Sequence, residues 1–138
     1  MNRTTCACKD CVACCKRQPG PLISGDMERI AKHLGLDIES VKQLFKASAG
    51  SLIGIRGGGI MRIPTITPKQ KEDGSCIFLD ERDRCRIHPV APFGCAYFDT
   101  HMSKDEGDKR VKYAICQHVK PEYQKLRKEL AGGCDETI

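Results

Sequence analysis

Tryptophan is absent from the 138 residues, and only four phenylalanines and three tyrosines supply aromatic rings. Aromatic side chains usually dominate the energetics of a buried core. The hydrophobic fraction of 40% also includes ten cysteines. The sequence therefore predicts a modest, mainly aliphatic core. Cross-linking or bound metal is the usual supplement to a core of that size.

Long apolar runs are missing as well. No segment approaches the roughly 18 consecutive apolar residues that a membrane helix needs. The first residues are polar ones and cysteines, where a secretory signal would carry an apolar stretch. We therefore expect a cytoplasmic protein that does not bind membranes. Because thiols stay reduced in that compartment, the cysteines favour metal binding over a disulfide framework.

The formal net charge of +5 would suit a nucleic-acid partner if the cysteines were neutral. Cysteines bind metal as thiolates, however, and eight thiolates around two divalent cations would bring the net charge to about +1. The basic residues then offset sulfur charge, and we expect no nucleic-acid partner. A protein partner of unknown identity is left open.

Half of the cysteines fall within one stretch of ten residues, CACKDCVACC. The C-x₂-C-x₂-C spacing of Cys8, Cys11 and Cys14 is typical of a tight turn that directs sulfurs toward one metal. Two overlapping C-x-x-C pairs are a stronger signal than a single pair. Cys15 follows Cys14 directly, and neighbouring side chains diverge. We expect Cys15 to serve a second centre or to bridge two metals.

The remaining cysteines are spread over the second half of the chain. Four of them, added to four near the start, would suffice for two four-sulfur sites. Cys6 and Cys134 are left over and are interpreted as spare terminal thiols. The predicted metal ligands are Cys8, Cys11, Cys14, Cys15, Cys76, Cys85, Cys95 and Cys116.

The pattern of apolar residues and turn residues predicts an α+β fold. It indicates a small metal-stabilised single domain over 1–138, with a core of about 6–131, about three helices, a short β-hairpin and long irregular loops. Asp26 and Asp37 are typical helix caps. The expected helices cover 26–34, 37–49 and 119–131. A short edge strand is expected within 57–68, and the hairpin over 76–88.

The cysteine pattern resembles a known family. The stretches CKDCVACC (8–15) and GSCIFLDERDRCRIHPVAPFGC (74–95), followed by Cys116, are similar to the CxxCxxCC cysteine-cluster family, whose domains are described as zinc- or iron-chelating. The resemblance extends from Cys8 to about Cys116. It implies that the eight cysteines at the matching positions bind metal. Many members carry Arg-Pro where this chain has Ala91-Pro92.

The identity of the metal is left between two alternatives. Three closely spaced cysteines with a remote fourth favour an iron–sulfur cluster, because no second C-x-x-C pair follows as in many zinc sites. The usual Cys-Pro of a ferredoxin run is absent, so zinc stays the alternative. His88 and His118 lie near cysteines and are interpreted as structural rather than as ligands. His101, beside Asp99, is a weaker candidate for a supporting or acid–base role.

These observations favour a cysteine-rich metal-binding protein over an enzyme. We expect an iron–sulfur cluster or zinc held by eight thiolates, serving electron transfer, cluster or metal delivery, or metal handling. The alternative is a zinc-stabilised protein-interaction module without a redox role. No glycine-rich cofactor motif appears, and the thiols are better used as ligands than as nucleophiles.

Overall fold

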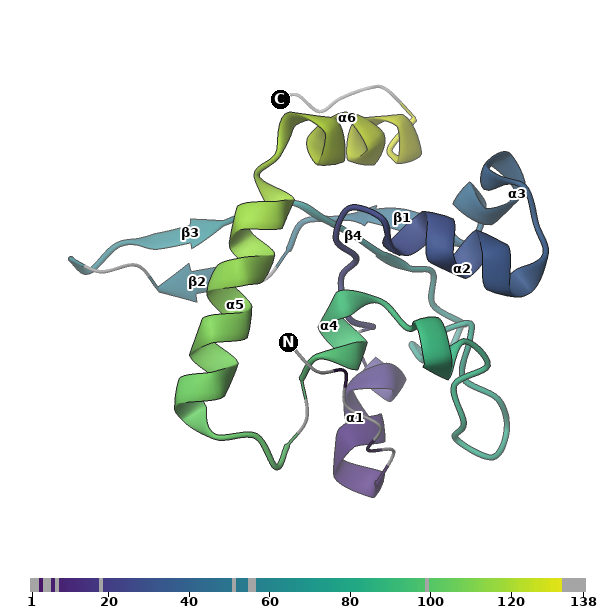
Figure 1. Cartoon of the computed structure of the whole chain (residues 1–138), viewed down its shortest axis with the longest axis horizontal. Coiled ribbons are helices and arrows are strands. Elements are labelled where there is room, and N and C mark those ends of the chain that lie inside the picture. The colour runs from purple at the N-terminus through teal and green to yellow at the C-terminus, as the bar shows by residue number, and fades with distance from the viewer. Residues whose placement is uncertain are drawn as a thin grey trace.

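The computed structural model describes residues 3, 6, 8–17, 19–50, 52–54, 57–98 and 100–132 (Figure 1). Its elements are α1 (Lys9–Arg17), α2 (Asp26–Leu34), α3 (Ile38–Lys42), β1 (Phe45–Ser48), β2 (Leu52–Gly54), β3 (Ile60–Arg62), β4 (Thr65–Pro68), the 3₁₀ turn η1 (His88–Val90), α4 (Phe93–Ala96), α5 (Lys104–His118) and α6 (Pro121–Leu130). The α+β class predicted from the sequence is confirmed. The described residues hold six α-helices rather than about three.

Two antiparallel strand pairs organise the middle of the molecule. Strand β1 pairs with β4, Phe45 lying opposite Pro68, and β2 pairs with β3. Helix α6 packs on β1 and β4, while α2 and α3 pack together at the other end of this pair (Figure 1). The core lies between these elements, and its most deeply buried side chains are Leu22, Ile30, Val41, Phe45, Ile66, Phe78 and Ile87. No helix among the described residues is long and apolar enough to cross a membrane.

The predicted helix over 37–49 is wrong in its second half. Asp37 caps α3 as expected, because its side chain accepts a hydrogen bond from the Ser40 N–H at 2.8 Å. The helix ends at Lys42, and the chain then enters β1. Phe45 is 2% exposed there and packs on the ring of Phe78. Pairing with β4 buries this aromatic residue better than another helical turn would, so tertiary contacts override the local periodicity.

Three helices have no counterpart in the sequence prediction, the shortest being the four-residue α4. Helix α1 occupies the cysteine-rich head, where a tight turn was expected. Helix α5 is the longest of the three, and its buried residues are Arg110, Ala114 and His118 rather than an apolar stripe. Hydrophobic periodicity therefore gave no signal for it. A Ser-x-x-Glu capping sequence does mark its start, since the Ser103 side chain accepts a hydrogen bond from the Glu106 N–H.

The expected hairpin over 76–88 is a loop in which one β-bridge, between Leu79 and Cys85, joins the two arms. A second bridge joins Cys76 to Gln70, outside the expected hairpin, and the segment forms no strand of several residues. The expected edge strand within 57–68 is resolved as two strands, β3 and β4. The predicted last helix is confirmed as α6, with Pro121 at its first position.

Asp26 connects α2 to the short helix α4. It is the first residue of α2 rather than its cap, and it is fully buried. One carboxylate oxygen accepts hydrogen bonds from the Ile23 N–H at 2.9 Å and the Phe93 N–H at 2.8 Å. The other oxygen pairs with Arg29. Because Phe93 begins α4, this carboxylate fixes the position of the helix that carries Cys95.

Replacing this carboxylate tests its importance. Asp26→Ala leaves the N–H groups of Ile23 and Phe93 without an acceptor, so we expect a loss of about 3 kcal/mol in the free energy of unfolding. Urea unfolding in reducing buffer measures the change. Glu28→Ala, on the exposed side of the same helix turn, is the control and should change stability by less than about 0.5 kcal/mol. Equal effects of the two substitutions would contradict this role.

Candidate metal centre

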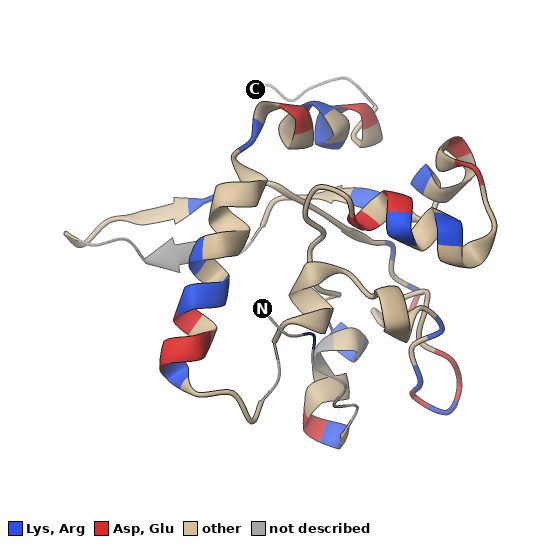
Figure 2. Ribbon diagram, viewed as in Figure 1, with Lys and Arg blue, Asp and Glu red and all other residues tan. Residues whose placement is uncertain are grey.

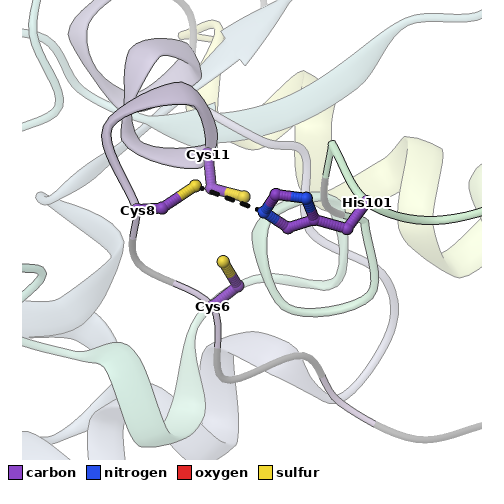
Figure 3. A group of neighbouring side chains, drawn as sticks. All are labelled: Cys6, Cys8, Cys11 and His101. Carbon is purple, nitrogen blue, oxygen red and sulfur yellow. Dashed lines mark hydrogen bonds between the residues drawn. The ribbon is translucent and has the colours of Figure 1, made fainter.

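Three cysteines and one histidine converge beside the start of α1 (Figure 3). Cys8 immediately precedes the helix, Cys11 lies in its first turn, Cys6 comes from the preceding segment, and His101 comes from the turn before α5. Their four potential ligand atoms all lie within 4.8 Å of one another. We call Cys6, Cys8, Cys11 and His101 the outer group, since the three cysteines are partly exposed and the histidine is exposed.

The surroundings of Cys8 favour its thiolate form. The backbone N–H of Cys11 and the ring of His101 both hydrogen bond to its sulfur, and they lower the pKa of Cys8 to about 6. The distance between the Cys8 Sγ and the His101 Nε2 is 3.4 Å. Thr100 adds a hydroxyl at 3.5 Å from the Cys11 Sγ. The N-terminus of a helix also favours the thiolate, which is the form of cysteine that binds metal. At neutral pH the sulfur of Cys8 is therefore ready to bind a cation.

The compactness of the outer group fits a single tetrahedral ion. Zinc–sulfur bonds of about 2.3 Å at tetrahedral angles place neighbouring donor atoms about 3.8 Å apart. The donors of the outer group, within 4.8 Å of one another, need only a small adjustment to reach that arrangement. An iron–sulfur cubane spreads its four cysteine sulfurs over the corners of a larger body. The geometry therefore favours one metal ion at this position.

A second set of thiols lies deeper, around the last turns of α1. Cys15 of α1 hydrogen bonds through its thiol to Cys95 of α4. Cys76 and Cys85, at the two β-bridges, are close enough to Cys15 for their charges to interact. We call Cys15, Cys76, Cys85 and Cys95 the inner group. Its members come from three separate parts of the chain, which the fold brings together.

Backbone N–H groups point at the sulfurs of the inner group. The Gly20 N–H donates to the Cys95 Sγ at 3.3 Å. The backbone N–H groups of Phe78 and Ile87, each two residues after a cysteine, act to lower the pKa of Cys76 and Cys85, respectively. Such hydrogen bonds stabilise the thiolate over the thiol and are a general feature of metal–sulfur sites.

Burial works in the opposite direction. It raises the pKa of Cys76 to about 11 and also raises the pKa of Cys85. The hydrogen bond with Cys15, together with burial, raises the pKa of Cys95 well above its usual value, and the same bond lowers the pKa of Cys15 to about 7. Several negative sulfurs cannot share this space without a compensating positive charge. A cation would supply that charge, but among the described residues only the outer group has its ligand atoms within 4.8 Å of one another, so the inner sulfurs would have to move closer to share an ion.

Two glycines permit the close approach that positions Cys95. Gly20 passes so near to Gly94 that a β-carbon on Gly20 would lie 2.8 Å from the Cys95 sulfur and overlap the backbone of Gly94. A β-carbon on Gly94 would collide with Pro21 in the same way. The Gly94 N–H also donates to the Pro21 carbonyl at 2.9 Å. The contact between these two segments thus holds the α4 cysteine against α1.

A cavity of about 400 Å³ lies between the two sulfur groups. Cys6 and Cys11 of the outer group line it together with Cys15, Cys85 and Cys95 of the inner group. Most of the remaining wall is apolar, from residues such as Val12, Leu79, Ala96 and Phe98, and His88 also reaches it. The two sulfur groups are therefore neighbours across one shared space.

The structure separates the eight predicted ligands. Cys8 and Cys11 fall in the outer group, and Cys15, Cys76, Cys85 and Cys95 form the inner group. Cys116 is exposed on α5, and its role as a ligand stays a prediction. Cys14 lies in α1, but its side chain falls outside the described part of the molecule, as do Asp99 and all of Cys134.

Two members of the outer group were not among the predicted ligands. Cys6 was interpreted as a spare thiol, and His101 only as a weak candidate, yet both stand beside Cys8 and Cys11. The Cys6-x-Cys8 spacing was an available signal for Cys6. His101 had none, because only the fold brings it to α1. His118 is buried, and its ring hydrogen bonds with the Leu22 carbonyl at 2.9 Å, so its contacts are those of a structural residue.

Comparison with known proteins agrees with this sulfur-rich arrangement. The family model CxxCxxCC, described as a putative zinc- or iron-chelating domain, matches residues 7–128. The chain belongs to the CxxCxxCC family. That match supports metal binding as its chemistry, and it begins one residue after Cys6. No curated protein and no solved structure gives a match.

A substitution at Gly20 tests the packing that holds Cys95 in this CxxCxxCC domain. Gly20→Ala should force the loop away from α4, lower stability by about 1–3 kcal/mol, and raise the rate at which Cys95 reacts with a thiol reagent. Gly107→Ala is the matched control, because its β-carbon would meet no atom closer than 4.0 Å. It should be neutral or stabilising by up to about 1 kcal/mol. Unchanged reactivity of Cys95 in Gly20→Ala would contradict the proposed packing.

The pKa of Cys8 gives a pH-dependent prediction. In metal-free protein, alkylation of Cys8 should follow its thiolate, rising with pH to half its maximum near pH 6 and levelling off above pH 7. An ordinary thiol would still be rising above pH 8. His101→Ala removes a hydrogen bond that lowers this pKa, so its midpoint should move to higher pH. Mass spectrometry of the Cys8 peptide gives the rates. A midpoint near 8.5 in the unsubstituted protein would contradict the assignment.

Proposed function

We propose that the protein binds one zinc ion through Cys6, Cys8, Cys11 and His101 and serves metal handling. The observation that carries this proposal is the convergence of four donor atoms within 4.8 Å of one another, from two segments far apart in the sequence. Three sulfurs and one imidazole nitrogen form one of the common ligand sets of protein zinc. The family match supports chelation of zinc or iron in general.

Zinc is favoured over an iron–sulfur cluster at this position by donor type and spacing. A histidine beside three cysteines suits a metal that accepts both nitrogen and sulfur. Cysteines alone hold the common ferredoxin clusters. The four donors also lie too close together for the corners of a cubane. Zinc needs no change of oxidation state, so this centre would not carry electrons.

Exposure favours handling of the ion over a purely structural role. His101 is exposed, and the three cysteines of the outer group are only partly covered. Structural zinc sites also have four protein ligands, and they contribute folding energy. Here the ligands themselves are partly or fully exposed, so an incoming thiolate or a second protein can reach the ion and exchange with them. We therefore favour metal delivery or storage over the alternative of a zinc-stabilised interaction module.

A second candidate function is electron transfer by an iron–sulfur cluster. Five cysteine side chains line the cavity of about 400 Å³, and this is the observation that favours it. Such a cluster would take Cys15, Cys85 and Cys95 with one further thiol. Purification without oxygen distinguishes the two candidates, because a cluster gives a brown protein with acid-labile sulfide.

Metal analysis of purified variants tests the zinc proposal. After saturation with zinc, Cys6→Ser and His101→Ala should each hold about one equivalent less than the unsubstituted protein, because three remaining ligands hold the ion less tightly. His33→Ala, which replaces an exposed histidine on α2, is the matched control and should keep its zinc. Full zinc content in both outer-group variants, or iron with sulfide in the unsubstituted protein, would overturn the assignment.

A further inference from the structure

The two sulfur groups share one helix and one cavity. Cys11 belongs to the outer group and Cys15 to the inner group, and both lie on α1. Residues four apart on a helix project from the same face, one turn from each other. Both side chains line the cavity of about 400 Å³. The cavity is therefore lined by sulfurs of both groups.

The walls of this cavity suit a cation that is bound to sulfur rather than to water. Helix α4 contributes no charged residue (Figure 2), and Ala96 from α4, Phe98 after it and Val12 of α1 are apolar. The acidic residue at the cavity, Asp83, is paired with Lys16 at 2.8 Å. A hydrated divalent ion loses its water shell at a high cost in such surroundings. Thiolates can replace those waters one at a time.

The two groups also differ in accessibility. The outer group has an exposed histidine, whereas in the inner group Cys76 is 6% exposed and Cys95 lies under the Gly20–Gly94 contact. An ion from solvent meets the outer group first. Cys15, Cys85 and Cys95 are half-buried and line the cavity. Once drawn together around a soft cation, the four inner sulfurs give it one more thiolate than the outer group does, which favours binding.

We propose that the outer group is the entry site for a soft divalent cation, which passes by ligand exchange from Cys11 to Cys15 and comes to rest in the inner group. This inference rests on the proposed function, since it requires the outer group to bind the ion. In the transfer, three metal–thiolate bonds and one metal–imidazole bond break, and four metal–thiolate bonds form. The oxidation state of the metal is unchanged. Any inner thiol that still carries a proton releases it to solvent or to a vacated outer thiolate.

Cobalt(II) is a suitable cation for testing this path, because its visible absorption distinguishes three sulfurs and one nitrogen from four sulfurs. One equivalent of Co²⁺ is mixed with the reduced, metal-free full-length protein, and the spectrum is followed with time. The proposal expects an early three-sulfur spectrum that converts to a four-sulfur spectrum. Cys15→Ser and Cys85→Ser should form the early spectrum and stop there.

Removing the entry site gives the sharper result. His101→Ala should lack the early spectrum and fill the inner group at least about tenfold more slowly, while reaching the same final four-sulfur spectrum. His33→Ala is the matched control and should behave as the unsubstituted protein.

If His101→Ala loses the early spectrum but fills the inner group at the unsubstituted rate, the transfer path is overturned and the outer zinc site stands. If the unsubstituted protein forms no early spectrum that depends on His101, the proposed function fails as well. An early spectrum that never converts overturns the inner destination alone.

Discussion

The helical spacing of cysteines on α1 is the constraint on which the rest of the structure depends. A helix turns its side chains through a fixed angle at each residue, so residues four apart share a face. Cys11 and Cys15 therefore border one cavity although they belong to different sulfur groups. A flexible loop with the same sequence could gather all its sulfurs on one ion. The helix instead places Cys11 in the outer group at its start and Cys15 in the inner group near its end.

The remainder of the fold holds the partners of α1 in place. Asp26 fixes the start of α4 through the Phe93 N–H. The ring of Phe93 stacks on Tyr97, with centroids 4.6 Å apart, and also meets Tyr113 of α5. These aromatic contacts join α4 to α5, the two helices on either side of the segment that carries His101. The aliphatic core can be small because the aromatic contacts between α4 and α5, and the contacts of the sulfur groups with α1, also hold these segments together.

The sequence was sufficient for the α+β class, the metal-binding chemistry and the family, since all three follow from local patterns of cysteines and apolar residues. It was insufficient where the result depends on contacts between distant segments. Phe45 fits a helical stripe, and only its pairing with β4 shows it to be in a strand. Helix α5 buries Arg110 and His118, so it lacked the apolar period by which helices are recognised. His101 lies 93 residues from Cys8, and no spacing rule connects the two.

X-ray absorption spectroscopy at the zinc edge tests the central claim most directly. The account predicts that the zinc-saturated protein shows sulfur neighbours at about 2.3 Å with a minor contribution from nitrogen at about 2.0 Å. The nitrogen contribution should vanish in His101→Ala, which leaves only zinc bound by sulfur. A first shell of oxygen and nitrogen alone, or a nitrogen contribution that persists without His101, would contradict the account.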